Sequence, residues 1–375
     1  MAEYQLKDQF GLSAPRAIAR MIRAVHPDFP HEDFLRDVAR GYGPMSLTGR
    51  GFHVAEALRR HLPRDYPVAI DILLESASQP HEHRASNGMA GFLYMPHLFF
   101  VARHGLDHFE ESMRAQHALT QLFTAEFSIR AFLEKYPDRT LARLREWVSD
   151  PSHHVRRLVS EGTRPRLPWA PRLRAFPRDP RPVLELLELL RDDPELYVRR
   201  SVANNLNDIG KDHPVLLADV AKRWLRDATP EREWVIRHAL RSAVKRADAG
   251  ALRALGFGGK VEVSIRGVRI SPARPRIGDA VTISFDLVNP TRRPQRVMAD
   301  LVIHFAKARG TGAKTFKLRA VTLAAGERVT LAKKIGLAQL TTRRHYPGEH
   351  RVEAQLNGQA RRLGSFLLVA AGRRG

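Results

Sequence analysis

The triplet Val155-Arg156-Arg157 returns forty-three residues later as Val198-Arg199-Arg200, and each copy starts five residues after the aspartate of an Asp-Pro pair. A looser third copy, Val235-Ile236-Arg237, follows thirty-seven residues after the second. A repeat spacing of about 40 residues is typical of stacked helix pairs of the HEAT type. The sequence therefore predicts a helical solenoid. Because each copy carries arginine at the same point, we expect arginines to line up along one face.

Helical periodicity extends over most of the first 255 residues. Apolar residues recur at spacings of three and four, as on the buried face of an amphipathic helix, in segments 14–25, 52–62, 66–74, 115–133, 141–148 and 183–193. Prolines stand where a helix is expected to stop or restart, at Pro63, Pro67, Pro137 and Pro151. These features predict short antiparallel helices, as a solenoid requires.

The stretch 163–182 breaks this rhythm, because it holds six prolines and six arginines. A compact domain rarely keeps so long a loop without a function, although an inserted linker is the alternative. Trp169 lies in the middle of the stretch. A tryptophan at this position favours a loop that packs on another part of the protein.

A second domain is expected after the glycine-rich segment Gly256-Phe257-Gly258-Gly259. From there the apolar period changes from helical to two, in about seven short runs, and Asn357-Gly358 predicts a hairpin turn between the last two. Such a pattern is typical of an immunoglobulin-like sandwich. We therefore expect an all-α HEAT-like domain over 1–255, a linker over 256–259, and an all-β immunoglobulin-like domain over 260–375.

The charge of the chain points to a polyanionic partner. The net charge is +22, and +16 of it lies in residues 260–375. Nucleic acid is the first interpretation of such an excess; a solubility function or an anionic membrane surface remains open. The chain has no cysteine, which excludes disulfides and thiolate metal sites. No signal peptide is expected at the N-terminus, and the apolar stretch 92–102 is too short to span a bilayer.

Residues four apart on a helix share a face, so the second arginine of each repeat defines a column. The three predicted columns are Arg157 and Glu161; Arg200, Asn204 and Asp208; and Arg237, Arg241 and Lys245. If the repeats stack, these columns form a surface that is basic at its edge. Its middle would carry two carboxylates, Glu161 and Asp208.

Carboxylates in this position need a reason, because a groove that only holds phosphates is weakened by an anion. Glu161 either pairs with Arg157 in solvent or stabilises a cationic substrate or an oxocarbenium ion. Asp208 is either such an acid or part of a polar helix end capped by Gly210. Glu126, among aromatic residues, is either an exposed position on an amphipathic helix or a partly desolvated acid.

Several other chemistries find no support in the sequence. His81-Glu82-His83 and the adjacent His153 and His154 lack the spacing of zinc ligands on a helix, so no metal is expected. The sequence shows no phosphate-binding glycine loop, no Gly-x-Ser-x-Gly motif, and no kinase or nuclease signature.

Two long motifs carry a resemblance to a known family. Residues 155–169, VRRLVSEGTRPRLPW, and residues 198–208, VRRSVANNLND, resemble the AlkC family of bacterial DNA alkylation-repair glycosylases. The resemblance spans the helical region. Some members of that family carry an immunoglobulin-like domain after HEAT-like repeats, in agreement with the sandwich expected here.

The resemblance implies a monofunctional glycosylase that releases N3-methyladenine, and also N3-methylcytosine, from duplex DNA. It implies that Glu126, Glu161 and Asp208 are the acids and that Trp169 lies beside the lesion. It further makes Arg157 and Arg200 DNA-facing cations. We expect the other DNA-binding side chains to be Arg164, Arg166, Arg237, Arg241 and Lys245.

The remaining expectations follow from this function. The protein is expected to need no cofactor, to act as a monomer, and to be cytoplasmic and associated with the nucleoid when bound to DNA. The leading alternative is a HEAT-repeat scaffold that binds nucleic acid without catalysis, and a third is a protein-interaction solenoid. The basic sandwich is expected to help grip the DNA, with the segments 291–294 and 342–345 as candidate contact loops.

Overall fold

The computed structural model describes residues 6–78, 90–340 and 343–371, and these form two compact units, Met1–Ile209 and Gly210–Gly375. The boundary between the units falls inside one helix, α11 (Leu196–Asp212). Each unit has its own core and is described by itself.

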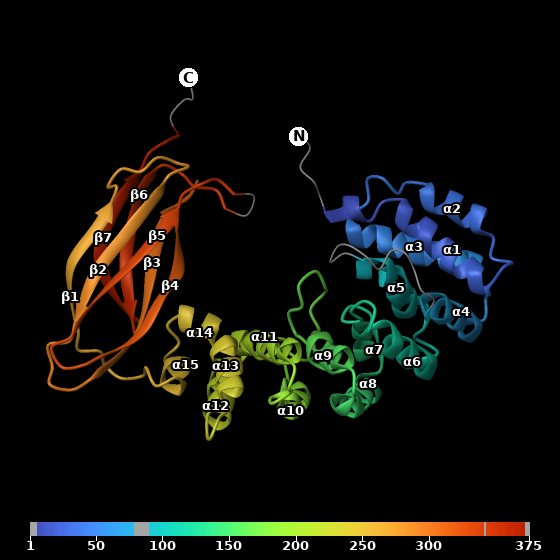
Figure 1. The fold of residues 1–375 in the computed structure, drawn as a ribbon, viewed down its shortest axis with the longest axis horizontal. Coiled ribbons are helices and arrows are strands. Elements are labelled where there is room, and N and C mark those ends of the chain that lie inside the picture. The colour runs from blue at the N-terminus through green and yellow to red at the C-terminus, as the bar shows by residue number, and fades with distance from the viewer. Residues whose placement is uncertain (1–5, 79–89, 341–342, 372–375) are drawn as a thin grey trace. The chain divides into compact units, whose positions relative to one another are not determined.

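The first unit is helical and its helices follow one another in short antiparallel steps, from α1 to α11 (Figure 1). Its α-helices are α1 (Ser13–Val25), α2 (His31–Ala39), α3 (Leu47–His61), α4 (Tyr66–Ser78), α5 (Met95–His104), α6 (Phe109–Leu119), α7 (Ile129–Lys135), α8 (Pro137–Glu146), α9 (His153–Gly162), α10 (Arg181–Leu190) and the start of α11. Among the described residues of this unit, the 3-10 helices are η1 (Leu6–Gln9), η3 (Ala90–Tyr94) and η4 (Trp147–Ser149).

The repeated Asp-Pro and Val-Arg-Arg motifs build the same local structure twice. Asp150 accepts a hydrogen bond from the Ser152 amide at 2.8 Å, and Asp193 accepts one from the Glu195 amide at 2.9 Å, just before α9 and α11. Aspartate in this place satisfies an amide that the first helical turn leaves unpaired. The repeated aspartate is thus explained by helix initiation.

The first arginine of each triplet then secures the turn. Arg156 donates from Nη1 to the carbonyls of Asp150 and Pro151, and Arg199 donates in the same way to the carbonyls of Asp193 and Pro194. Arg156 also pairs through Nε with the Asp193 carboxylate at 2.6 Å, which joins one repeat to the next. The first arginines therefore stabilise the fold.

The expected helix over 115–133 is wrong, because the segment forms two helices, α6 and α7, with a non-helical connection over 120–128. Side chains in the connection bind the backbone and compete with helical bonds. Thr120 accepts from the Ala125 amide at 3.3 Å, and Ser128 donates to the Ala125 carbonyl at 3.1 Å. Glu126 therefore lies in this connection and not on the face of a helix.

The expected capping role of Gly210 is also wrong, since α11 continues to Asp212. A Cβ atom at position 210 would lie 2.1 Å from Cδ2 of Leu217. The glycine therefore allows α12 (Pro214–Trp224) to pack closely against this turn of α11. Sequence alone does not distinguish a glycine that ends a helix from one that admits a neighbour.

The arginine-proline loop after α9 is anchored by apolar side chains other than its tryptophan. Leu167, Leu173 and Phe176 are buried, whereas Trp169 is 73% exposed. Trp169 also has a positive φ of 64°, a backbone conformation that few side chains adopt outside glycine. The loop thus packs on the protein, as expected, through its buried apolar side chains, while the indole of Trp169 is presented to solvent.

The second unit combines the last helices with a β-sandwich. Its helices are α12, α13 (Pro230–Ala239), α14 (Arg241–Lys245) and α15 (Ala249–Ala254). The strands that the structure describes after them are β1 (Ser264–Ser271), β2 (Ala280–Val288), β3 (Gln295–Ala306), β4 (Thr311–Leu323), β5 (Arg328–Gly336), β6 (Gly348–Leu356) and β7 (Gln359–Leu368). The antiparallel strands form two sheets, β1-β2-β5 and β4-β3-β6-β7.

The sandwich core follows from the alternating pattern. Val281, Ile283, Phe285 and Leu287 of β2 are all buried. Asn357 and Gly358 have positive φ angles of 45° and 84° and turn the chain between β6 and β7, as the dipeptide predicts. An all-α region followed by an immunoglobulin-like sandwich is therefore confirmed.

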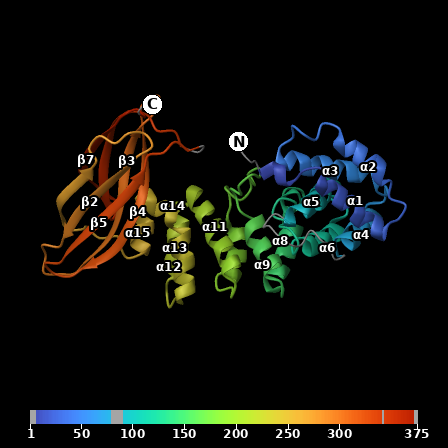
Figure 2. The same ribbon diagram turned by 45° about the horizontal axis from the view of Figure 1, so that its top comes forward.

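The short helices of the second unit lie beside the four-stranded sheet (Figure 2). Thr315 of β4 donates to the Lys245 carbonyl at 3.3 Å, and Gln355 of β6 donates to the Val244 carbonyl at 3.4 Å. The compact unit thus begins before the predicted linker at 256–259, which still marks the change from helix to strand; as a domain boundary it stays a prediction. Within the described ranges, none of the helices has the length and apolar character needed to cross a membrane.

Candidate active site

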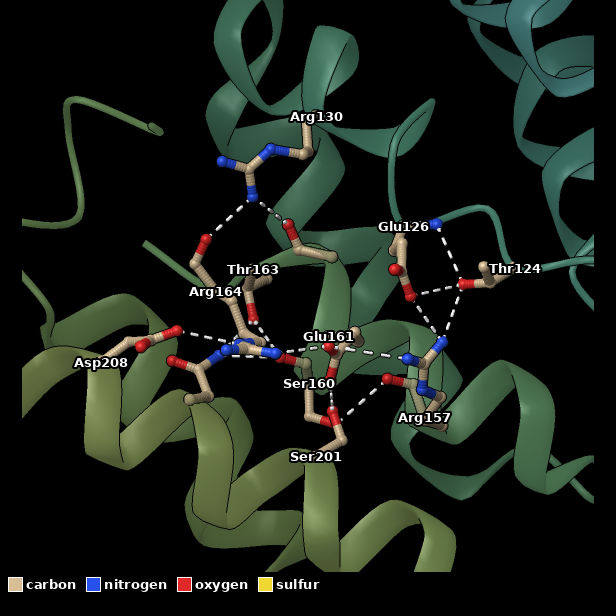
Figure 3. A network of polar contacts seen from close by, with 12 residues as sticks. Thr124, Glu126, Arg130, Arg157, Ser160, Glu161, Thr163, Arg164, Ser201 and Asp208 are labelled. Atoms are coloured by element: carbon tan, nitrogen blue, oxygen red, sulfur yellow. Dashed lines mark hydrogen bonds and ion pairs between the residues drawn. The ribbon is translucent and has the colours of Figure 1, made fainter. Parts of the chain in front are cut away.

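Three buried carboxylates of the first unit are joined by two arginines into one chain of alternating charge (Figure 3). Arg157 lies 2.6 Å from Glu126 and 3.5 Å from Glu161. Arg164 lies 2.6 Å from the same oxygen of Glu161 and 2.9 Å from Asp208. The sequence singled out all three acids, and the structure brings them together from the α6–α7 connection, α9 and α11.

A row of polar contacts between α9 and α11 holds Glu161 in place. Ser201 donates to Oε2 of Glu161 at 2.6 Å, and Ser160 lies 2.7 Å from the Ser201 hydroxyl. One turn further, Asn205 donates to the Ser160 carbonyl at 2.8 Å and to the Thr163 hydroxyl at 3.0 Å. Both oxygens of Glu161 are therefore engaged, Oε1 by guanidinium groups and Oε2 by a hydroxyl.

The predicted column Arg200, Asn204 and Asp208 is not the row that faces α9. Asp208 shares its side of α11 with Ser201 and Asn205, seven and three residues earlier. With 3.6 residues per turn, two turns correspond more closely to seven residues than to eight. Positions counted in steps of four therefore move gradually away from one face of the helix. For this reason the sequence does not place Ser201 and Asn205 on the same face as Asp208.

Thr124 and Arg130 are further site residues that the sequence analysis missed. Thr124 donates to Oε2 of Glu126 at 2.7 Å and accepts from Arg157 at 2.8 Å, so its hydroxyl completes the pair between them. Arg130 donates to the carbonyls of Gly162, Arg164 and Pro171, at 3.2 Å and 2.8 Å for the first two. Burial lowers the pKa of Arg130 to about 10, so it remains charged at neutral pH.

Arg130 thereby fixes both ends of the loop segment that carries Trp169. Close packing assists it at Gly162, where a Cβ atom would lie 2.5 Å from Cγ2 of Ile129. The glycine after Glu161 thus lets the end of α9 approach α7. A threonine in a polar connection and an arginine on a helix give no signal in sequence that would identify these contacts.

Ion pairs hold the buried charges of the network. Glu126, Glu161 and Asp208 are 9%, 5% and 1% exposed, and Arg157 and Arg164 each lie between two of these carboxylates. Burial opposes the charge on both arginines, but the neighbouring carboxylates outweigh it and raise the pKa of each. The carboxylates thus keep both guanidinium groups charged where burial alone would oppose it.

A cavity of about 240 Å³ opens beside this network. Glu126 and Glu161 line it together with the indole of Trp169 and several aromatic side chains, among them Phe92, Phe123 and Phe127. A neighbouring cavity of about 360 Å³ shares Trp169 and Phe127 in its wall. Asp208 lines neither cavity and lies behind Arg164.

The predicted DNA-binding residues of the first unit fall into two groups. Arg157 and Arg164 have side chains only 14% and 11% exposed and contact carboxylates. Arg200 is exposed and Arg166 is half-buried. Only Arg200 thus offers an exposed guanidinium in the free protein, and contact of any of the four with DNA stays a prediction.

In the second unit, Arg237, Arg241 and Lys245 line a cavity of about 160 Å³ with Lys317 of β4. Asp300 of β3 lies in the same wall, and its burial raises its pKa. Arg237 also pairs with Glu233 at 3.1 Å. The three predicted cations of the third column are thus gathered at one place, next to a fourth.

Two predicted features fall outside the described residues, namely His81-Glu82-His83 and Thr342 of the segment 342–345. Where side chains are described, no group of three potential ligands could hold a metal ion. His153 and His154 lie with ring centroids 4.1 Å apart at the start of α9.

Comparisons with known proteins agree with this architecture. Residues 264–370 match the family described as "Uncharacterised protein YhaZ, C-terminal Ig-like domain". The uncharacterized protein YhaZ of Bacillus subtilis (strain 168) is 36% identical over 358 residues, 95% of this chain and 97% of that protein. The structure of the Pseudomonas fluorescens alkylpurine DNA glycosylase AlkC bound to DNA containing an abasic site analog is 38% identical, with a TM-score of 0.90, over 98% of this chain and 100% of that chain.

Proposed function

The chain belongs to the AlkC family of DNA glycosylases, and from this premise we propose that it releases cationic N3-alkylated bases from duplex DNA by hydrolysing the N-glycosidic bond. N3-Methyladenine is the proposed main substrate and N3-methylcytosine a second one. The observation that carries this proposal is the buried group of Glu126, Glu161 and Asp208 beside an aromatic cavity that Trp169 lines.

The chemistry of the lesion fits a site built from buried carboxylates. An N3-alkylated base carries a positive charge, so its glycosidic bond is weakened and the base can leave without being protonated. As the bond breaks, positive charge develops on the sugar. Preorganised anions in a site that excludes water stabilise such charge more strongly than solvent does. A carboxylate can also orient water or accept its proton as it attacks C1′ of the sugar.

We assign the two carboxylates that line the cavity the direct roles. Glu126 and Glu161 would face the sugar, since both contribute to the cavity wall. Asp208 would act through Arg164, which it holds at 2.9 Å against Glu161. The two arginines hold the carboxylates in fixed positions until a cationic lesion arrives.

The aromatic wall would supply selectivity for a cationic base. A cation over an aromatic face gains about 0.5–2 kcal/mol, and most over tryptophan. Trp169 is exposed and stands at the rim of the cavity, which leaves its indole face accessible to a base. Such contacts favour a cationic lesion over a neutral base without hydrogen bonds that read the base.

Phosphate contacts are proposed for the exposed and surface cations. These are Arg200 and Arg166 in the first unit and Arg237, Arg241 and Lys245 in the second. The net charge of +16 over residues 260–375 supports a grip on DNA by the sandwich as well. Distorting the duplex around the lesion costs a few kcal/mol, which such contacts would offset.

Base release by the Glu161→Gln variant tests this function. Purified wild-type protein is expected to free N3-methyladenine from methylated duplex DNA, and the variant to be at least about a hundredfold slower in single turnover. Its DNA affinity should stay equal or rise, because an anion near the DNA has been removed. Glu185→Gln, which changes an exposed glutamate that pairs with Arg145 on the surface, is the matched control.

The non-catalytic scaffold makes the opposite prediction. If the wild-type protein binds duplex DNA but frees no alkylated base, the enzyme proposal is overturned and the scaffold stands. If Glu161→Gln releases base as fast as Glu185→Gln, a glycosylase would remain but its assigned acid would be wrong.

A further inference from the structure

The repeated motif contains a feature that the proposed function leaves unused. The residue directly before each valine carries a ring, since His154, Tyr197 and Trp234 precede Val155, Val198 and Val235. His154 and Tyr197 are separated by the same forty-three residues as the two Val-Arg-Arg triplets. A ring at this position therefore recurs together with the arginine column.

Tyr197 shows what the ring can do. The Cζ atom of Arg157 lies 4.9 Å from the centroid of the Tyr197 ring, over its face. Tyr197 stands on the first turn of α11, four residues before Ser201, so it belongs to the same row as Ser201 and Asn205. It is the outermost member of the row that holds α9, and it is 41% exposed.

Polar groups also hold Arg157. Thr124 and Glu126 bind Nη1, and Glu161 lies 3.5 Å from Nη2, a longer contact. A flexible side chain between two carboxylates can shift toward either of them. An aromatic face beneath a planar guanidinium restricts that movement, because the ring attracts the cation and stacks on its plane.

We propose that Tyr197 is a positioning residue, whose ring face holds Arg157 between Glu126 and Glu161 and so keeps both carboxylates in place at the catalytic cavity. This inference rests on the proposed glycosylase function. The ring, and not the hydroxyl, performs the task. Burial raises the pKa of Tyr197, so the phenol stays neutral and its face keeps the electron density that attracts a cation.

The groups around Arg157 determine what its displacement would change. Glu126 faces it from the α6–α7 connection, Glu161 from α9, and Tyr197 from α11. His153 and His154 lie edge-on to the Tyr197 ring, with centroids 6.1 Å and 5.9 Å away. If Arg157 moves away, the two carboxylates lose the cation that holds them at the cavity.

A pair of substitutions separates the ring from the hydroxyl. Tyr197→Phe keeps the aromatic face, and Tyr197→Leu keeps an apolar side chain without a π-system. For Tyr197→Leu we expect a single-turnover rate of base release about tenfold lower at neutral pH. Tyr197→Phe should retain the wild-type rate, and the DNA dissociation constant should stay within about twofold for both.

A second measurement tests position without relying on catalysis. The side-chain Nε–Hε signal of Arg157 in NMR spectra of the full chain should stay at its wild-type shift in Tyr197→Phe and move in Tyr197→Leu. A loss of fold in the leucine variant would appear as a change throughout the amide spectrum. In that case Tyr197→His, with a smaller ring, replaces it in both assays, with an intermediate rate and an intermediate displacement of the Arg157 signal expected.

Different results overturn different statements. If wild-type protein releases no base, the proposed function fails regardless of Tyr197. If wild type is active but Tyr197→Leu keeps both the rate and the Arg157 Nε–Hε shift, the positioning role is overturned. It is also overturned if Tyr197→Phe loses as much as Tyr197→Leu, or if the variants weaken DNA binding while the rate at saturating DNA is unchanged. The last result would make Tyr197 a DNA contact.

Discussion

In the first unit Arg157 and Arg164 lie buried between three carboxylates, whereas in the second unit Arg237, Arg241 and Lys245 share a cavity wall with one carboxylate, Asp300. Arg157 and Arg237 occupy the same position of the repeated motif, and Arg164 joins Arg157 from the loop after α9. An arginine at this repeat position therefore serves a different purpose in each unit, and the residues that surround it determine which.

The difference has an electrostatic consequence. Buried pairs act over a few ångströms and are screened little by salt, while exposed cations act over a Debye length, about 10 Å at 0.1 M salt. The first unit is therefore suited to stabilising charge on one reacting sugar. The second is suited to attracting a phosphate backbone. Variants of each group should fail in different assays, stability and chemistry for one and salt-dependent affinity for the other.

The largest effect is expected when the buried group is broken at its centre. Arg164→Met leaves Glu161 and Asp208 without the guanidinium that joins them, at side-chain exposures of 7% and 2%. Breaking a buried pair by removing one partner costs about 3–5 kcal/mol. The free energy of unfolding from urea titration should fall by that amount, and base release should fall by more than about a hundredfold.

A matched surface variant controls for the loss of an arginine. Arg181→Met removes an ion pair with Asp179 in which the arginine side chain is 80% exposed. Its unfolding free energy should change by less than about 1 kcal/mol. Equal stability of both variants would mean that the buried network does not hold the first unit together.

The repeat and the alternation made the fold predictable. Val155 and Val198 are buried in equivalent places, and the strands of the sandwich follow the period of two. The break between α6 and α7 was not predictable, because its cause is a set of side-chain bonds from Thr120 and Ser128 to the backbone. Apolar spacing continues through the break and hides it.

The acidic residues of the candidate site could be predicted from the sequence, but the network of contacts that joins them could not. Glu161 and Asp208 stand out because carboxylates oppose phosphate binding. Their partner Arg164 comes from an irregular loop whose path no periodicity defines, and Ser201 lies seven residues from Asp208 on α11. Contacts between separate elements depend on how those elements pack, which a pattern along one helix does not contain.

A smaller effect is expected at the rim of the cavity, where the contact is with the base and not with the charge on the sugar. Trp169→Ala should slow the release of N3-methyladenine by about five- to thirtyfold, the equivalent of about 1–2 kcal/mol for a cation–π contact. Trp169→Phe should recover most of the rate. Because Trp169 is 73% exposed, neither change should lower the melting temperature by more than about 1–2 °C.

The same variants test selectivity. If the indole recognises positive charge, the Trp169→Ala substitution should slow the release of a neutral base analogue less than it slows the release of the cationic lesion from the same duplex. An equal loss on both would assign Trp169 to the distortion of DNA, and the aromatic wall would no longer explain the preference for a cation.

The smallest effect on chemistry is expected in the second unit. A double variant, Arg237→Gln with Lys245→Gln, removes two cations from the wall of the 160 Å³ cavity. If each contacts one phosphate, the slope of log K against log salt should fall by about 1–2, and affinity near 0.1 M salt by several-fold, roughly three- to thirtyfold. The single-turnover rate at saturating DNA should stay at the wild-type value, because the buried network of the first unit is intact.

Lys222→Gln supplies the control, since it removes a cation of α12 that is not part of the cavity wall and lies 3.7 Å from Asp219. An unchanged salt slope in the double variant would remove the cavity from the DNA interface. A slower rate at saturating DNA with an unchanged slope would contradict the comparison itself, because cations of the second unit would then act on the chemistry. If only the affinity falls, the result supports the comparison: the cations of the second unit bind DNA, and the charged residues of the first unit act on the sugar.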